Sequence, residues 1–291
     1  MDIRDTVFFI SSNRRISFTS YNEINATIQY DTKLKSLLYG KMMLIETALK
    51  NIALNTIMAE IDSNSIYDMY DKAVSSYKNA PPGTAEDIRK KFQNNKLNLQ
   101  GSIQNSIAAA YRKENPKITH FYNTANYNEV PIWAIFEILT MGDFGYLLSC
   151  LTQDIRRKIS KNIGLNLSSD TNCTLVYKYV YALKDLRNAI AHNDVAYDTR
   201  FRKIDPSKPM KQCLMIEMRL PYINFKTIGD YIILICYFLK LLKISKTEIK
   251  SFIREFEKIT KEYKEQVSSD VAAITIHPDL FPRMTILKNT L

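Results

Sequence analysis

Three polar side chains close together in the sequence, Arg187, Asn188 and His192, are of the types that metal-free cleavage of RNA could use. A histidine can take the proton of a ribose 2′-hydroxyl because its unperturbed pKa of about 6.5 lies close to neutral pH. The 2′-oxygen then attacks the adjacent phosphorus, and a guanidinium stabilises the phosphorane because it stays charged and offers a planar fork of donors. Asn188 lies four residues before His192, on the same helical face, where it can orient the histidine or bond a phosphate oxygen. The predicted product carries a 2′,3′-cyclic phosphate, and no metal is required.

These residues close a long helical pattern, which must position them. Its apolar side chains recur at steps of three and four: Leu175, Tyr179, Leu183, Leu186 and Ile190. Five residues of an ideal helix turn by about 500°, so Arg187 and His192 point roughly 140° apart. Either the helix breaks between them or a second copy completes the site, and we favour a two-fold homodimer. The structural alternative is that Arg187 pairs with Asp185 or Asp194 and that His192 caps the helix C-terminus, where a cation is favoured.

Two blocks of sequence resemble a known family. The motif Arg187-Asn188-(x)3-His192 resembles the signature of HEPN-type ribonucleases. The surrounding segment "LRNAIAHN" is similar to the corresponding segment of bacterial abortive-infection (Abi) proteins of the AbiD/AbiF group. Residues 131–150, "PIWAIFEILTMGDFGYLLSC", resemble the Pro-x-Trp segment, the Thr-x-Gly turn and the Leu-Ser pair of that group. Glu46 matches a glutamate inside the first strong helix of the group.

The resemblance covers roughly residues 10–285 and implies a mostly α, HEPN-like helical bundle with at most a short β hairpin. It implies a toxic endoribonuclease that acts in anti-phage defence, with Arg187 and His192 as the catalytic pair, Asn188 beside them, and neither metal nor other cofactor. RNA is the implied partner, both as substrate and as a small antitoxic RNA of the kind that accompanies some relatives. Two other functions stay open: a non-catalytic RNA-binding module, and a helical protein-interaction or membrane-surface factor.

The charge balance favours a polyanionic partner. The chain has 40 Lys and Arg residues against 30 Asp and Glu, a net charge of +10, which attracts nucleic acid or an anionic membrane surface. Basic side chains that neutralise phosphates release counterions, so clusters of them are candidate RNA contacts. Three clusters qualify: Arg89, Lys90 and Lys91; Arg156, Arg157, Lys158 and Lys161; and Arg200, Arg202 and Lys203. For the first cluster a solvated helix face is an equal alternative.

The composition argues against several other classes of protein. Seven glycines, with no G-x-G-x-x-G and no G-x-x-x-x-G-K, argue against a nucleotide-binding sheet. The four cysteines lie far apart and form no C-x-x-C pair, so zinc spacing is absent and reduced thiols are expected. The longest apolar stretch, residues 231–239, is too short to span a bilayer and predicts a buried core helix. The charged start lacks a secretory signal, so we expect a cytoplasmic protein without a membrane partner.

Apolar periodicity predicts helices through most of the chain. We expect long helices over 31–62, 225–243 and 246–266, and two helices within 131–150 that are separated by a left-handed Gly142. Trp133 is expected in the core. Residues 213–223 are the best candidate for a short strand or hairpin, and the tail around His277 is expected to pack as an irregular strap.

The predicted domain organisation has two parts. Residues 1–125 form a helical N-terminal region packed on the core, and residues 126–291 form the HEPN-like helical domain that carries the motif. A single continuous domain over 1–291 is the alternative, since a chain of this length fits either arrangement.

Overall fold

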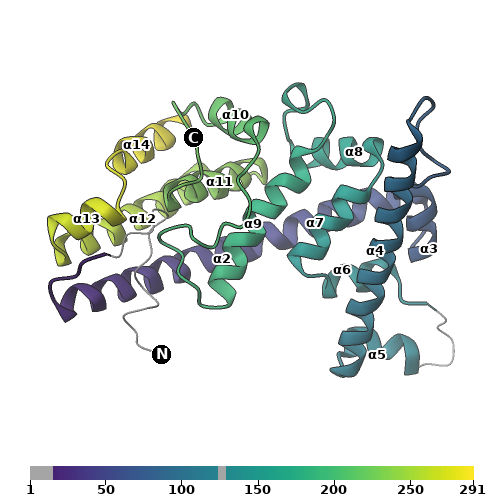
Figure 1. Ribbon diagram of the computed structural model, residues 1–291, viewed down its shortest axis with the longest axis horizontal. Coiled ribbons are helices and arrows are strands. Elements are labelled where there is room, and N and C mark those ends of the chain that lie inside the picture. The colour runs from purple at the N-terminus through teal and green to yellow at the C-terminus, as the bar shows by residue number, and fades with distance from the viewer. Residues whose placement is uncertain (1–15, 124–128) are drawn as a thin grey trace. The chain divides into compact units, whose positions relative to one another are not determined.

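Helices carry nearly all the regular structure of the protein. The computed structural model describes residues 16–123 and 129–291 (Figure 1). Within these ranges it has thirteen α-helices, one π-helical turn and one 3-10 turn, and a single β bridge joins Val74 to Leu151. The predicted mostly α class is therefore confirmed.

The elements follow one another in this order: α2 Tyr21–Ile61, α3 Ile66–Asp68, π-turn η1 Met69–Ala73, α4 Glu86–Arg112, α5 Pro116–Asn123, α6 Ile132–Ile138, α7 Met141–Cys150, α8 Gln153–Ile163, 3-10 turn η2 Leu167–Ser169, α9 Leu175–Ala191, α10 Lys208–Glu217, α11 Ile228–Leu241, α12 Lys246–Gln266, α13 Ser269–Thr275 and α14 Leu280–Thr290. The predicted helices over 31–62, 225–243 and 246–266 correspond to α2, α11 and α12. Helix α2 begins ten residues earlier than predicted, because the polar residues Glu23 and Thr27 occupy buried positions in its first two turns and interrupt the apolar pattern.

The chain folds into two compact units. The first unit combines the chain up to Ile45 with Ala182–Leu291, and the second unit is Glu46–Tyr181. The two boundaries fall inside α2 and α9, so each of these helices contributes residues to both units. The domain boundary expected at 125/126 lies outside the described residues.

In the first unit, the N-terminal part of α2 runs antiparallel to α12 (Figure 1). The rings of Tyr30 and Tyr263 stack with centroids 4.3 Å apart, and the Thr27 hydroxyl lies 3.1 Å from the Tyr263 hydroxyl. An exposed ion pair of 2.8 Å joins Lys33 to Glu262 on the same two helices. Aromatic stacking and apolar burial therefore hold these helices together, and the exposed ion pair adds little.

Helix α11 is the core helix of the first unit. Every residue from Ile228 to Leu239 is buried, as predicted for the apolar stretch 231–239. Within the described ranges, no helix has the length and apolar character that crossing a bilayer demands. All four cysteines are buried and carry free thiols.

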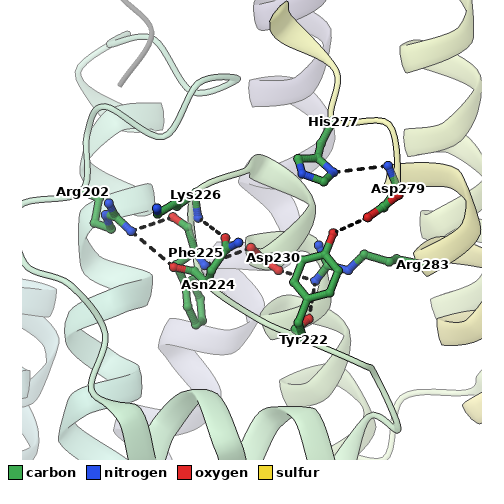
Figure 2. Close-up of polar contacts among 9 residues, drawn as sticks. All are labelled: Arg202, Tyr222, Asn224, Phe225, Lys226, Asp230, His277, Asp279 and Arg283. Carbon is green, nitrogen blue, oxygen red and sulfur yellow. Dashed lines mark hydrogen bonds and ion pairs between the residues drawn. The ribbon is translucent and has the colours of Figure 1, made fainter. Parts of the chain in front are cut away.

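A buried ion pair ties the last helix, α14, to the start of α11 (Figure 2). The Arg283 guanidinium pairs with the Asp230 carboxylate, and the two residues are 2% and 0% exposed. Arg283 also donates to the Tyr222 carbonyl at 3.0 Å and lies 4.4 Å from the centroid of the Tyr222 ring. The other Asp230 oxygen accepts the Phe225 backbone N–H at 2.9 Å. Burial of two charges is tolerated here because each has several compensating partners.

In the second unit, α4 packs on α7 and a short backbone ladder joins the π-turn to the end of α7. The Ser102 hydroxyl donates to the Asp143 carboxylate at 2.7 Å across the two helices. The Thr152 N–H donates to the Ala73 carbonyl at 2.8 Å, next to the bridge between Val74 and Leu151. The second unit therefore has helix packing and hydrogen bonds of its own.

Two predictions in the C-terminal part are wrong. Residues 213–223 form no strand: α10 occupies the first part, and Met210, Cys213 and Leu214 are its buried face. The helical spacing of three and four residues between apolar side chains becomes visible only when Met210 is included. The tail that was expected to be irregular, residues 276–287, is largely helical, because α14 begins at Leu280. Pro282 is compatible with α14 because it lies in the first turn, where backbone N–H groups have no helical partner.

Two predictions in the block 131–150 are also wrong. The break between α6 and α7 is at Leu139 and Thr140, where the Thr140 hydroxyl caps α7 by accepting the Asp143 N–H at 3.1 Å. Gly142 lies inside α7 without a positive φ. The Thr hydroxyl supplies the N-cap, so no left-handed glycine is needed. Trp133 is 42% exposed rather than buried, with its ring against Phe121.

Candidate active site

Helix α9 carries the Arg-Asn-His motif. Its beginning is capped by Asp170, whose carboxylate oxygens accept the Thr174 and Leu175 N–H groups at 2.9 and 2.7 Å. Further along, Leu183 and Leu186 are fully buried. The buried stripe sets the rotation of the helix and hence the directions in which the motif residues point.

The helix ends at the motif histidine in a regular C-terminal cap. The His192 N–H donates to the Asn188 carbonyl at 2.9 Å, so the helical bonding continues without a break through Ala191. The Asn193 N–H then donates to Ile190 at 3.3 Å and the Asp194 N–H to Ala189 at 2.8 Å. Asn193 adopts φ of +58°, the left-handed conformation that asparagine tolerates. This is the Schellman pattern, and it makes His192 the C-cap residue that follows Ala191.

The three motif residues differ in exposure. His192 is exposed, whereas Arg187 and Asn188 are half-buried on the preceding turn. Because the helix is continuous between them, Arg187 and His192 keep the angular separation of about 140° that five helical residues impose. One protomer therefore presents the two side chains in different directions.

Asp185 is buried and anchors the loop that follows the motif. Its carboxylate forms an ion pair of 2.8 Å with Lys184 and accepts the Lys203 backbone N–H at 3.4 Å. The same loop is held at its other end by Asp31 of α2, which accepts the Ala196 and Tyr197 N–H groups at 2.8 and 3.0 Å. Two carboxylates thus fix the course of residues 194–207 beside the helix end.

A pocket of about 510 Å³ lies near the end of α9 and has Asn193, the neighbour of His192, among its lining residues. Residues of α2 form one wall and residues of the following loop form the other, including Asp31, Lys35, Tyr197 and Phe201. Its size and its mixture of polar and aromatic side chains are those of a small-molecule or nucleotide subsite.

The basic residues of this loop are partly committed to the fold. Arg200 donates to Asp198 at 2.6 Å, and burial raises the pKa of the Asp198 carboxyl. Arg202 donates to the Phe225 carbonyl at 3.1 Å and pairs with Asp205 at 2.8 Å. Lys203 is exposed. Of the three predicted phosphate contacts in this loop, Lys203 presents its side chain to solvent most fully.

In the second unit, the side chain of Arg156 is used to stabilise the fold. Its guanidinium donates to the carbonyls of Cys173 at 3.1 Å, Ser149 at 3.4 Å and Leu151. Burial lowers the pKa of this guanidinium. With its donors directed at backbone carbonyls that end α7 and precede α9, Arg156 is poorly placed to bind phosphate.

The remaining basic residues of the second unit lie on its surface. Lys161 is exposed, Arg157 pairs weakly with Asp154 at 3.6 Å, and Lys158 pairs with Glu60. On α4, Lys90 and Lys91 are exposed, whereas Arg89 donates to the Thr84 carbonyl at 3.1 Å. These residues belong to a different unit from the motif and form candidate phosphate contacts of their own.

The sequence analysis missed Asp31 and Lys35, which contact the chain just beyond His192. An Asp and a Lys four residues apart on a helix are a common surface pattern, so their spacing gave no signal. Among the described residues, no three His, Cys, Asp or Glu side chains are grouped as metal ligands would be.

The fold and the motif together define an all-helical protein with an Arg-Asn-His surface at the end of a core helix. Residues 6–198 match the family described as Abi-like protein, and the chain belongs to that family. Neither the curated proteins nor the solved structures gave a match. The matched range includes the motif and ends before α10, and membership indicates a role in abortive infection, a defence against phage.

Proposed function

We propose that the protein is a metal-independent endoribonuclease that acts in anti-phage defence through Arg187 and His192. The observation that carries this proposal is the exposed His192 at the end of α9, one turn beyond a half-buried Arg187 and Asn188, within the part of the chain that matches the Abi-like family. An accessible imidazole and a guanidinium that reach the same phosphodiester are the minimum that 2′-hydroxyl attack requires.

The reaction balances without a cofactor. The His192 imidazole takes the proton of the 2′-hydroxyl, and the 2′-oxygen forms a bond to phosphorus. The Arg187 guanidinium stabilises the negative charge of the phosphorane. The bond from phosphorus to the 5′-oxygen breaks, and that oxygen takes a proton from a second acid. The products are a 2′,3′-cyclic phosphate and a 5′-hydroxyl.

The second acid and a second guanidinium are available in a homodimer. Since Arg187 and His192 point apart on an unbroken helix, one protomer assembles the pair poorly. A two-fold arrangement of α9 ends would bring two arginines and two histidines to one cleft. The test is to co-express Arg187→Ala chains with His192→Ala chains. Partial recovery of cleavage in the mixed dimer supports a shared site. A protein that is monomeric by light scattering and has full cleavage activity contradicts it.

The cleavage proposal is tested directly with purified protein and RNA. We expect the wild type to leave 2′,3′-cyclic phosphate ends in the presence of a chelator. His192→Ala should lower the rate roughly 100- to 10,000-fold, the usual contribution of a general base. The matched control is His120→Ala, which removes another exposed histidine. Equal cleavage by wild type and His192→Ala would rule out the assignment.

The second candidate is an RNA-binding module without catalysis. It is favoured by the exposed Arg157, Lys158 and Lys161, which lie in a different unit from the motif and could hold RNA independently of it. A small antitoxic RNA is the partner we expect in either case. Purification of the protein from cells, followed by sequencing of any bound RNA, tests this. A defined small RNA without cleavage by the wild type would favour the second candidate.

A further inference from the structure

Two side chains of α2 hold the chain immediately beyond His192. The Lys35 ammonium donates to the Asn193 side-chain oxygen at 2.6 Å and reaches the Asp194 carbonyl at 3.5 Å. It also pairs with Asp31 at 2.8 Å, and the other Asp31 oxygen accepts the Ala196 and Tyr197 N–H groups. We call these two α2 residues, Asp31 and Lys35, the clamp.

The clamp is sheltered from solvent, so its geometry is specific. The side chains of Lys35 and Asp31 are only 13% and 9% exposed. A sheltered ammonium is stable only where oxygen atoms replace its lost water, and Asp31, Asn193 and Asp194 supply them. Movement of Asn193 away from α2 would leave this charge poorly compensated.

The contact with Asn193 is not needed to satisfy the helix end. The Schellman bonds already use the N–H groups of Asn193 and Asp194, and the left-handed φ needs only a residue that tolerates it. What Lys35 adds is a fixed position for the Asn193 side chain relative to α2. His192 precedes Asn193 directly, so the same contact limits how the end of α9 can move.

We propose that Lys35 is a positioning residue for His192. By holding Asn193 it limits the positions that the neighbouring His192 imidazole can take at the end of α9. The inference rests on the proposed function for its activity readout. General-base catalysis demands narrow geometry, because a misplacement of about 1 Å can cost on the order of 100-fold in rate.

The test uses two substitutions that remove the contact from opposite sides. Lys35→Met keeps an apolar stem and leaves Asp31 bonded to two N–H groups, so the fold is retained. Asn193→Gly keeps the positive φ and removes the side-chain oxygen. We expect each variant to lose about 10- to 100-fold in kcat for RNA cleavage, with KM and RNA affinity unchanged. The double variant should be no worse than either single variant, since both remove one contact.

Two further variants separate positioning from a general structural effect. Asn193→Asp keeps an oxygen acceptor in a residue that tolerates the left-handed conformation, and it should restore most of the activity that Asn193→Gly loses. Lys33 is on the same helix as Lys35, and Lys33→Met breaks its exposed ion pair with Glu262 of α12. This variant should behave as wild type. Wild-type kcat in both Lys35→Met and Asn193→Gly would overturn the proposal.

A readout independent of activity distinguishes failure of this inference from failure of the proposed function. NMR relaxation of the His192 ring should report a rigid imidazole in the wild type and a mobile one in Lys35→Met. A mobile ring in the variant together with an inactive wild type would retain the positioning role and reject the catalytic assignment. Unchanged ring motion would reject the positioning role whatever the activity.

Discussion

Two carboxylate–cation pairs of the first unit, Asp230–Arg283 and Asp31–Lys35, share a hydrogen-bonding arrangement but differ in their surroundings. In each pair one carboxylate oxygen meets a cation, and the other accepts backbone N–H groups of a distant segment: Phe225 for Asp230, and Ala196 with Tyr197 for Asp31. The Asp230–Arg283 pair is closed off from solvent (Figure 2). The Asp31–Lys35 pair lines the pocket near the end of α9.

The difference teaches that burial, and not the type of pair, separates a pair that can only stabilise the fold from one that can also meet a ligand. A cation that is fully enclosed has no ligand to meet, and its loss leaves an uncompensated buried charge. Removal of a cation that lines a pocket destabilises the fold less. Its loss is then expected to change ligand binding or catalysis at the pocket. The same reasoning separates Arg156, which is directed at backbone carbonyls, from the exposed Arg157 beside it.

The largest effect on stability is expected from Arg283→Met. Removal of the guanidinium leaves Asp230 buried without its partner, so the free energy of unfolding should fall by about 3–5 kcal/mol. Urea denaturation followed by circular dichroism measures it. Lys33→Met, which breaks an exposed pair, is the control and should change stability by less than about 0.5 kcal/mol. Similar losses in the two variants would remove the basis of the comparison.

A smaller loss is expected from Asp31→Ala. This change leaves the N–H groups of Ala196 and Tyr197 without their carboxylate acceptor, and an unsatisfied buried donor costs about 1–3 kcal/mol. Lys35 keeps Asn193 as an acceptor, so its charge is not left alone. The same denaturation measurement applies. A loss as large as that of Arg283→Met would mean that the clamp is as structural as the buried pair.

The basic residues of the second unit should also differ in role, with exposed residues binding RNA and Arg156 stabilising the fold. Reversal of Arg157, Lys158 and Lys161 to Glu should weaken RNA binding and lower the slope of log affinity against log salt by roughly two, because each phosphate contact contributes about 0.7 on a single strand. Arg156→Met should instead reduce stability and leave the slope unchanged. Filter binding across a salt series measures the slope. Equal slopes for the wild type and the triple variant would place the RNA elsewhere.

A pH-dependent effect is expected at Glu23, whose carboxylate accepts the N–H group of Ser268 from a distant segment and that of Thr19 four residues away. Hydrogen bonds from Ser268 and Thr19 lower the pKa of Glu23 from 4.5 to about 2. A carboxyl whose pKa is depressed by folding stabilises the protein above its ordinary pKa, and that stability is lost as the pH falls towards the folded value. Thermal melts between about pH 5 and pH 2 should therefore show a steeper loss of stability for the wild type than for Glu23→Gln. Parallel curves would contradict the assigned hydrogen bonds.

The sequence by itself determined the helical class, the core face of α9 and the location of the motif. Apolar steps of three and four are a local property of the chain, and they predicted α9, α11 and α12 correctly. The family resemblance was found in the same way, since residues 185–194 and 131–150 are continuous segments. The angular separation of Arg187 and His192 also follows from local helix geometry.

Tertiary structure alone decided which polar residues serve the fold and which face solvent. Arg156 and Arg157 are neighbours in one basic run, yet only the former is directed at carbonyls, because the rotation of α8 turns it inwards. Likewise Lys35 resembles any helix-surface lysine until residues 193–197 are folded against it. The physical reason is that hydrogen bonds and ion pairs form between groups brought together from distant parts of the chain, and periodicity carries no information about such partners.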